Sequence, residues 1–91
     1  MDFEWDENIN QSNTKKHGIS FDEAKMAFLD EDMITKEDLR KDYGETRYIG
    51  IGKVAEIIII VVYTMRKTII RLISAKKANK KEKQIYYERK N

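Results

Sequence analysis

Hydrophobic and polar positions alternate in several segments of this chain, and these segments predict strands. Phe3 and Trp5 alternate with acidic residues, which is typical of a short strand with one buried face. The runs 57–63 and 68–74 are β-branched, aliphatic or aromatic at nearly every position, and they predict two strands joined by a turn at 65–67. Because runs of this length are too short to span a bilayer, we expect them in a small soluble sheet.

A third alternating segment, 47–52, precedes these two runs. It places Tyr48 on one face and Ile49 on the other, and it predicts the first strand of a three-strand antiparallel meander. The charged and weakly patterned segment 31–45 predicts a loop, with at most a short strand at 33–34.

Helices are predicted mainly from the signals at their ends. Asp6 is a favoured N-cap, and the helix that it begins should end at Gly18, with Ile9 as its main apolar residue. Ser20 and Glu23 form a capping box, in which each side chain satisfies a free backbone donor of the other residue. A second helix therefore begins there.

This second helix should end near residue 30 and bury one apolar side, which consists of Phe21, Ala24, Ala27 and Phe28. A second capping box, Asn79 with Glu82, begins a C-terminal helix that reaches Asn91. The predicted shared face of that helix consists of Glu82, Ile85, Tyr86 and Arg89. The order of elements is strand, helix, helix, short strand, three antiparallel strands and helix, which defines an α+β fold in one domain, residues 1–91.

The net charge of +2 conceals two halves of opposite sign. Residues 1–46 contain 6 Lys and Arg against 13 Asp and Glu, whereas residues 47–91 contain 12 against 3. The basic segment 76–90 suits a polyanion such as RNA, or an acidic segment of a partner protein. The alternatives are neutralisation by the acidic half within the fold, or an ordinary solvated surface of mixed sign.

Cysteine and signal-peptide features are absent from the sequence. Without cysteine there is no disulfide framework and no thiolate metal site. The acidic N-terminus lacks the apolar run of a signal peptide, which predicts a cytoplasmic protein with no membrane partner.

Three segments resemble the BrnT family of bacterial type II toxins: FEWDENINQSNTKKHGISFDEA, GETRYIGIG and VVYTMRKTIIRLISAKKA. The resemblance is weakest from residue 31 to residue 43. It implies a RelE/ParE-like fold, ribonuclease activity that arrests growth, and neutralisation by a BrnA-type antitoxin with a DNA-binding domain. In that family the toxin–antitoxin complex represses its own operon, so operator DNA is contacted only through the antitoxin.

The chemistry that fits these residues is RNA cleavage by the ribose 2′-hydroxyl, without a metal or cofactor. It needs a base, an acid and cations near the phosphate, and a single histidine with scattered acids suits it better than metal-assisted cleavage. The candidate catalytic residues are Arg66, Arg71, Lys76, His17 and Glu45. The candidate RNA-binding residues are Arg47, Lys77, Lys80 and Lys81.

Several candidates have a structural alternative. Arg71 interrupts an apolar strand, so it either serves the site or pairs with a carboxylate such as Glu82. His17 stands at a helix end and alternatively donates to the last carbonyls of that helix. Glu45 is explained better as a partner that fixes Arg47 than as a base. Tyr63 and Tyr86 are candidates for an acid or for a stacking platform, but aromatic residues at such spacing are more often core residues.

One departure from the family pattern leaves a second function open. Lys76 stands where the family usually has Arg, and lysine lacks the planar, two-pronged hydrogen bonding of arginine to phosphate. The alternative is a catalytically weak or inactive homologue that acts mainly as an antitoxin-bound transcriptional co-repressor. A ParE-like inhibitor of a target enzyme, related by fold only, is a third interpretation.

Overall fold

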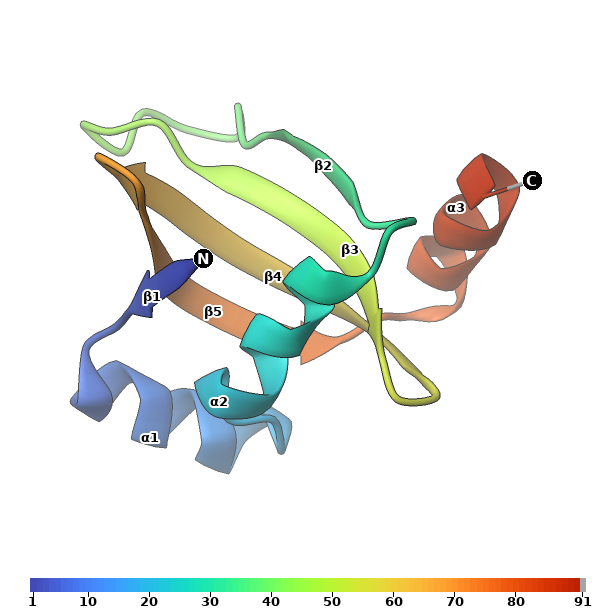
Figure 1. Ribbon diagram of the computed structural model, residues 1–91, viewed down its shortest axis with the longest axis horizontal. Coiled ribbons are helices and arrows are strands. Elements are labelled where there is room, and N and C mark those ends of the chain that lie inside the picture. The colour runs from blue at the N-terminus through green and yellow to red at the C-terminus, as the bar shows by residue number, and fades with distance from the viewer. Residues whose placement is uncertain (91) are drawn as a thin grey trace.

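A five-stranded sheet forms the centre of the molecule, and helices lie on both of its faces (Figure 1). The α+β class predicted from the sequence is confirmed. This computed structural model describes residues 1–90, so Asn91, the predicted last residue of the C-terminal helix, lies outside the described residues. The elements are β1 (Asp2–Glu4), α1 (Glu7–His17), α2 (Phe21–Ala24), the 3-10 helix η1 (Lys25–Leu29), β2 (Ile34–Glu37), β3 (Tyr48–Val54), β4 (Ile57–Arg66), β5 (Ile69–Lys77) and α3 (Lys80–Lys90).

The strands lie in the order β1-β5-β4-β3-β2. β3, β4 and β5 form the predicted antiparallel meander. The short strand expected at 33–34 is replaced by β2, which begins at Ile34, extends to Glu37 into the segment predicted as loop, and is antiparallel to β3. β1 pairs with β5 in parallel, so the first strand of the chain lies beside the last one. The sheet is therefore mixed, with its two short strands at the edges.

The predicted turn at 65–67 was placed too early. Met65 and Arg66 still belong to β4, and they pair with Ile70 and Ile69 of β5. The turn falls after them, with Lys67 in the left-handed region at φ 58°. The backbone pairing of the hairpin continues through Met65 and Arg66 although neither has strong strand propensity, so the β-branched and aromatic run alone gave the wrong boundary.

One face of the sheet carries the main core, under α1, α2 and η1. Its fully and nearly buried residues are Ile19, Phe21, Ala24, Ala27, Ile59, Val61, Tyr63, Ile70, Leu72 and Ala75. The apolar side predicted for the second helix is confirmed, but only its first turn is α-helical and the rest is 3-10. There Ala27 packs directly on Gly52, where an added Cβ would lie 3.0 Å from the Cβ of Ala27.

Two asparagines attach α1 to this core. The helix begins at the Asp6 cap and ends at Gly18 as predicted, but Ile9, expected to be its main apolar contact, is 46% exposed. The buried side chains of the helix are Asn10 and Asn13. A helix with almost no apolar side is thus held through hydrogen bonds rather than through packing.

The bonds of Asn13 cross to β5. Its amide donates to the carbonyls of Ala75 and Ile19 at 2.9 and 3.1 Å, and its carbonyl accepts from the Ala75 N–H at 3.1 Å. Asn10 accepts from the Phe21 N–H at 2.8 Å and so supports the start of α2. These bonds satisfy backbone groups that would otherwise be buried without partners.

α3 covers one end of the other sheet face. The Asn79–Glu82 capping box is confirmed by both of its hydrogen bonds. Of the four residues predicted to share one face of this helix, only Tyr86 is buried, whereas Ile85 and Arg89 are exposed. Tyr86 packs with a small cluster on the sheet, formed by Ile58, Ile60 and Ala78 with Ile34, Ile49 and Ile51 beside it. The helix therefore docks at a single point rather than along a full face.

The hydroxyl of Tyr86 donates to Oδ2 of Asp30 at 2.6 Å, and the same oxygen accepts from the Lys53 N–H at 2.8 Å. Burial raises the pKa of Tyr86 above its usual range, and the hydrogen bond to the Asp30 carboxylate is the second cause. The phenol therefore remains a donor. We expect Tyr86→Phe to lower the free energy of unfolding by about 2 kcal/mol, because a bond to a charged acceptor is lost. Urea unfolding measures this change.

The matched control is Tyr87→Phe, since Tyr87 is 43% exposed on the same helix. Equal stability of Tyr86→Phe and Tyr87→Phe would contradict the proposed importance of the Asp30 bond.

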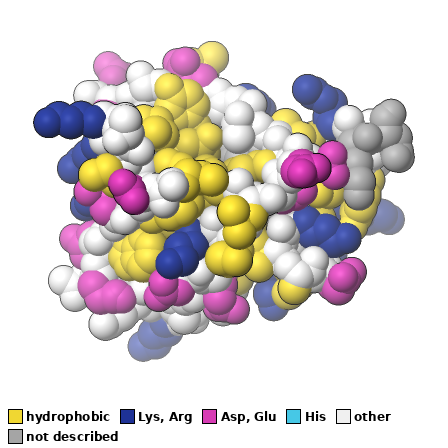
Figure 2. Space-filling view, viewed as in Figure 1, with side chains coloured by type: hydrophobic (Ala, Val, Ile, Leu, Met, Phe, Trp, Pro, Cys, Tyr) yellow, Lys and Arg dark blue, Asp and Glu magenta, His cyan; other side chains and the backbone are white. Residues whose placement is uncertain are grey.

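The surface has charges of both signs. On the face shown in Figure 2, acidic side chains follow the lower edge, over α1 and α2, and hydrophobic side chains gather in the middle. None of the helices in the described part of the chain is long and apolar enough to cross a membrane.

Candidate active site

The sheet face opposite the main core remains partly open beyond α3, and a β-bulge decides which side chains of β5 lie on it. Val62 pairs with Ser74 and the next residue of β4 pairs with Leu72, so Ile73 is an extra residue in β5. Because side chains alternate along a strand, Arg71 would face the core if the pairing were regular. The bulge places Arg71 on the same open face as Ser74 and Lys76.

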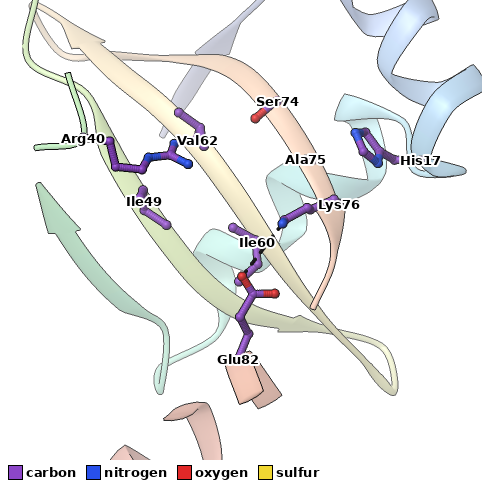
Figure 3. Close-up of a pocket in the computed structure, with 9 residues that line it drawn as sticks. All are labelled: His17, Arg40, Ile49, Ile60, Val62, Ser74, Ala75, Lys76 and Glu82. Atoms are coloured by element: carbon purple, nitrogen blue, oxygen red, sulfur yellow. Dashed lines mark ion pairs between the residues drawn. The ribbon is translucent and has the colours of Figure 1, made fainter. Parts of the chain in front are cut away.

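A pocket of about 160 Å³ lies on this open face (Figure 3). Its apolar floor comes from β3 and β4, and polar groups approach from α1, the β2–β3 loop, β5 and α3. The lining residues are His17, Arg40, Ile49, Ile60, Val62, Ser74, Ala75, Lys76 and Glu82. Segments that are far apart in the sequence therefore meet at one concave site.

Two predicted catalytic residues, Lys76 and His17, line this pocket. The Lys76 ammonium lies 3.9 Å from a carboxylate oxygen of Glu82, and its side chain is 48% exposed, so the cation stays accessible from solvent. The predicted alternative for His17 was capping its own helix, but the cap bond comes from the Gly18 N–H, which donates to the Thr14 carbonyl. The His17 ring instead borders the pocket at the C-terminus of α1.

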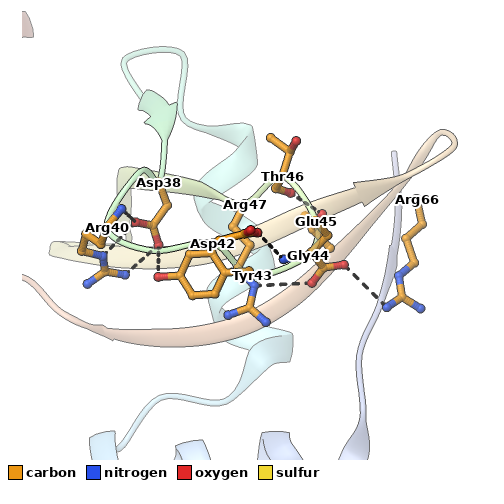
Figure 4. Close-up of polar contacts among 10 residues, drawn as sticks. Asp38, Arg40, Asp42, Tyr43, Gly44, Glu45, Thr46, Arg47 and Arg66 are labelled. Atoms are coloured by element: carbon orange, nitrogen blue, oxygen red, sulfur yellow. Dashed lines mark hydrogen bonds and ion pairs between the residues drawn. The ribbon is translucent and has the colours of Figure 1, made fainter.

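The second cation of the pocket, beside Lys76, is Arg40, which comes from the loop between β2 and β3. The loop is closed at its base by the Asp38 N–H, which donates to the Arg47 carbonyl at 2.7 Å. The carboxylate of Asp38 is fully buried and accepts from Nε and Nη2 of Arg40, both at 2.8 Å, and from the Tyr43 hydroxyl at 3.0 Å (Figure 4). The Arg40 guanidinium beside it holds the pKa of Asp38 well below its usual range. Asp38 thus fixes Arg40 at the pocket.

The same loop continues into a second polar cluster. The Arg47 guanidinium carbon lies 4.2 Å from the centre of the Tyr43 ring, and its Nε lies 3.4 Å from Glu45. Arg66 of β4 lies 3.9 Å from the other oxygen of Glu45. Figure 4 shows the guanidinium groups of Arg40, Arg47 and Arg66 pointing to the same side. Glu45 thus contacts two arginines, which suits the interpretation of it as a fixing partner.

Arg71 pairs with Glu4 at 3.0 Å across the β1–β5 pairing. The suggested partner Glu82 was wrong, because Glu82 lies at the start of α3 and contacts Lys76. The parallel pairing of β1 places Glu4 directly beside Arg71, a neighbourhood that depends on sheet order and is not visible in the sequence.

The remaining candidates lie outside the pocket. Lys77 lines a separate hollow with Glu56 and Tyr87. The pKa of the Glu23 carboxyl is lowered mainly by its hydrogen bonds with Ser20, and the charge of Lys77 lowers it further. Lys80 and Lys81 are exposed on the first turn of α3. The tyrosines Tyr63 and Tyr86 are buried and belong to the two cores, so neither is available to stack on a base.

Nothing in the sequence pattern marks Arg40, Ser74 or Glu82 as pocket residues, nor Asp38 as the carboxylate that holds Arg40. Arg40 lies in a charged segment without periodicity, where nothing distinguishes it from its neighbours. The buried state of Asp38 depends on loop closure, which has no sequence signature here. Among the residues that the structure describes, no three His, Cys, Asp or Glu side chains are grouped so that they could hold a metal ion.

The fold and this pocket define a small α+β protein whose partly open sheet face carries a pocket lined by Lys76 and Arg40. A family model described as "Ribonuclease toxin, BrnT, of type II toxin-antitoxin system" matches residues 5–82, most of the chain. The chain therefore belongs to the BrnT family of ribonuclease toxins, and the resemblance noted in its sequence is confirmed. A type II toxin has a protein antitoxin as its partner. No curated protein matches the chain.

Proposed function

We propose that this chain is an endoribonuclease that cleaves RNA by attack of the ribose 2′-hydroxyl, without a metal, at the pocket on the open sheet face. The observation that supports this proposal is the meeting of Lys76, Arg40 and His17 in one concave site of a ribonuclease-toxin family member. Cations that surround the scissile phosphate stabilise the charge that develops on it in the transition state.

Each pocket residue has a role that its chemistry suits. Lys76 and Arg40 hold the phosphate oxygens, the second through a planar guanidinium whose orientation Asp38 fixes. His17 and Glu82 are the proton-transfer groups within the pocket. The imidazole of His17 suits proton transfer to the leaving 5′-oxygen, and the Glu82 carboxylate suits removal of the 2′-hydroxyl proton.

The other cations serve the strand on either side of the cleaved bond. Arg71 shares the open face with Lys76, and Arg47 and Arg66 continue the line of guanidinium groups from Arg40. Glu45 keeps the last two in place and is not itself a base in this scheme. The predicted contacts at Lys77, Lys80 and Lys81 remain peripheral RNA contacts in this proposal.

Neutralisation follows from the same surface. We expect a BrnA-type antitoxin in the cytoplasm to cover the open face with an acidic segment, which blocks the pocket sterically and pairs with its cations. The antitoxin supplies the DNA-binding domain, so operator DNA is contacted only through it.

Two ion pairs favour the second function, a weakly active homologue that acts as antitoxin-bound co-repressor. Lys76 lies near Glu82 and Arg71 is paired with Glu4, so two cations of the open face already have carboxylate partners. Both carboxylates must release or share their cation before it binds phosphate.

Expression of the chain without its antitoxin in a bacterial host tests the proposal. We expect growth arrest and loss of total RNA, and we expect Lys76→Ala to abolish both and Lys76→Arg to preserve or strengthen them, because arginine binds phosphate with two donors. The control is Lys15→Ala, which removes an exposed cation of α1. Normal growth with intact RNA at good soluble expression would refute the ribonuclease and leave the co-repressor.

A further inference from the structure

The β2–β3 loop contains an aromatic ring and a guanidinium in cation–π contact. The guanidinium carbon of Arg47 lies 4.2 Å from the centre of the Tyr43 ring, and the ammonium of Lys41 lies 5.2 Å from it. Neither main partner is part of the two cores: Tyr43 is half-buried, and the side chain of Arg47 is 27% exposed. This contact lies outside the pocket that the proposed chemistry uses.

Both members of this contact are held in place before any ligand arrives. The Tyr43 hydroxyl donates to Asp38, and Nε of Arg47 donates to Glu45. A guanidinium plane that lies on an aromatic ring presents its other side as a flat, cationic surface. Unpaired nucleobases stack on aromatic rings and on arginine planes of this kind.

The contact also lies next to the pocket. The Asp38 carboxylate accepts from Tyr43 through Oδ2 and from Arg40 through both oxygens, so one buried group positions the ring and the pocket cation together. Arg40 and Arg47 point to the same side of the loop (Figure 4). A strand whose phosphate contacts Arg40 therefore carries a neighbouring base past Arg47.

We propose that Arg47, supported by Tyr43, is a stacking site for one unpaired nucleobase of the RNA strand whose phosphate occupies the pocket. This inference rests on the proposed function. It makes the chain selective for single-stranded RNA, because a base within a duplex is already stacked on its neighbours and does not reach the platform.

Binding of uncleavable RNA tests the inference separately from catalysis. The probes are fluorescein-labelled 2′-fluoro RNA hexamers of mixed sequence, which lack the attacking hydroxyl, with an abasic residue at each position in turn. For the wild-type chain we expect one abasic position to weaken binding roughly 5-fold or more. In the Tyr43→Leu and Arg47→Lys variants, the abasic residue at that position should no longer weaken binding, because the substitution has already removed the stacking surface.

Two variants separate stacking from loop folding. Tyr43→Trp retains an aromatic surface and should retain the abasic effect, and Tyr87→Leu removes an exposed tyrosine of α3 and should behave as the wild type. An abasic effect that persists in Tyr43→Leu, or that appears at no position, would overturn the stacking site even if the chain cleaves RNA. A wild-type chain that neither binds the hexamers nor cleaves RNA would overturn both this inference and the proposed function.

Discussion

Replacing Asn13 by alanine is expected to lower the free energy of unfolding by at least about 3 kcal/mol. The change removes the partners of three backbone groups, the N–H and carbonyl of Ala75 and the carbonyl of Ile19, and leaves them buried. A domain of this size has a total stability of only about 5–15 kcal/mol, so much of the population unfolds under mild denaturant. Urea unfolding, followed by circular dichroism, measures the loss.

Gln11→Ala is the matched control, because Gln11 is exposed on the same helix and loses a similar side chain. Asn13→Asp should be at least as destabilising as Asn13→Ala, since a buried carboxylate accepts from the Ala75 N–H but places a charge against two carbonyl oxygens to which it cannot donate. An Asn13→Ala variant as stable as Gln11→Ala would show that packing, not these bonds, holds α1 to the sheet.

Asp38→Asn is expected to lower kcat/KM for RNA cleavage by about 100-fold while leaving the sheet folded, because a small misplacement of Arg40 suffices for that loss. Asparagine cannot accept two charge-assisted bonds from Arg40 and a third from Tyr43. The decisive comparison is with Asp42→Asn, whose carboxylate lies exposed in the same loop. Equal activity of the two variants would contradict the positioning role of Asp38.

The same residue predicts a dependence on pH. Because Arg40 depresses the pKa of Asp38 in the folded chain, the stabilisation is complete above the unfolded value near 4 and is lost as the pH falls toward the lower folded value. The stability difference between wild type and Asp38→Asn should therefore shrink as the pH is lowered below about 4. A difference that stays constant from pH 7 to pH 3 would show that the carboxylate charge contributes nothing to the loop.

Most features that depend on neighbours in the sequence were predicted correctly, although the turn between β4 and β5 was placed too early. Both capping boxes, the left-handed Gly18 and the β3–β5 meander arise from residues a few positions apart, or from apolar periodicity that marks a buried face. The attachment of α1 was not predicted, because the bonds of Asn13 to Ala75 join residues 62 positions apart. An amide side chain gives no sign of which distant backbone group it will meet.

The candidate site was predicted in part for the same reason. His17 and Lys76 stand out as the lone histidine and as a cation in a family motif, and both line the pocket. Arg71 reaches the open face only because of the bulge at Ile73, and regular alternation along β5 would have turned it inward. No glycine or other special residue marks this bulge, so its position becomes visible only in the pairing with β4.

The parallel pairing of β1 with β5 also has a consequence for folding during synthesis. Asp2–Glu4 is synthesised long before its partners in β5, Ile69–Arg71, and the pocket also contains Glu82 from the helix after that strand. β1 therefore has no partner strand until Arg71 has been added to the growing chain. The pocket is complete only once Glu82 has been added, so translation products that stop before this residue lack it.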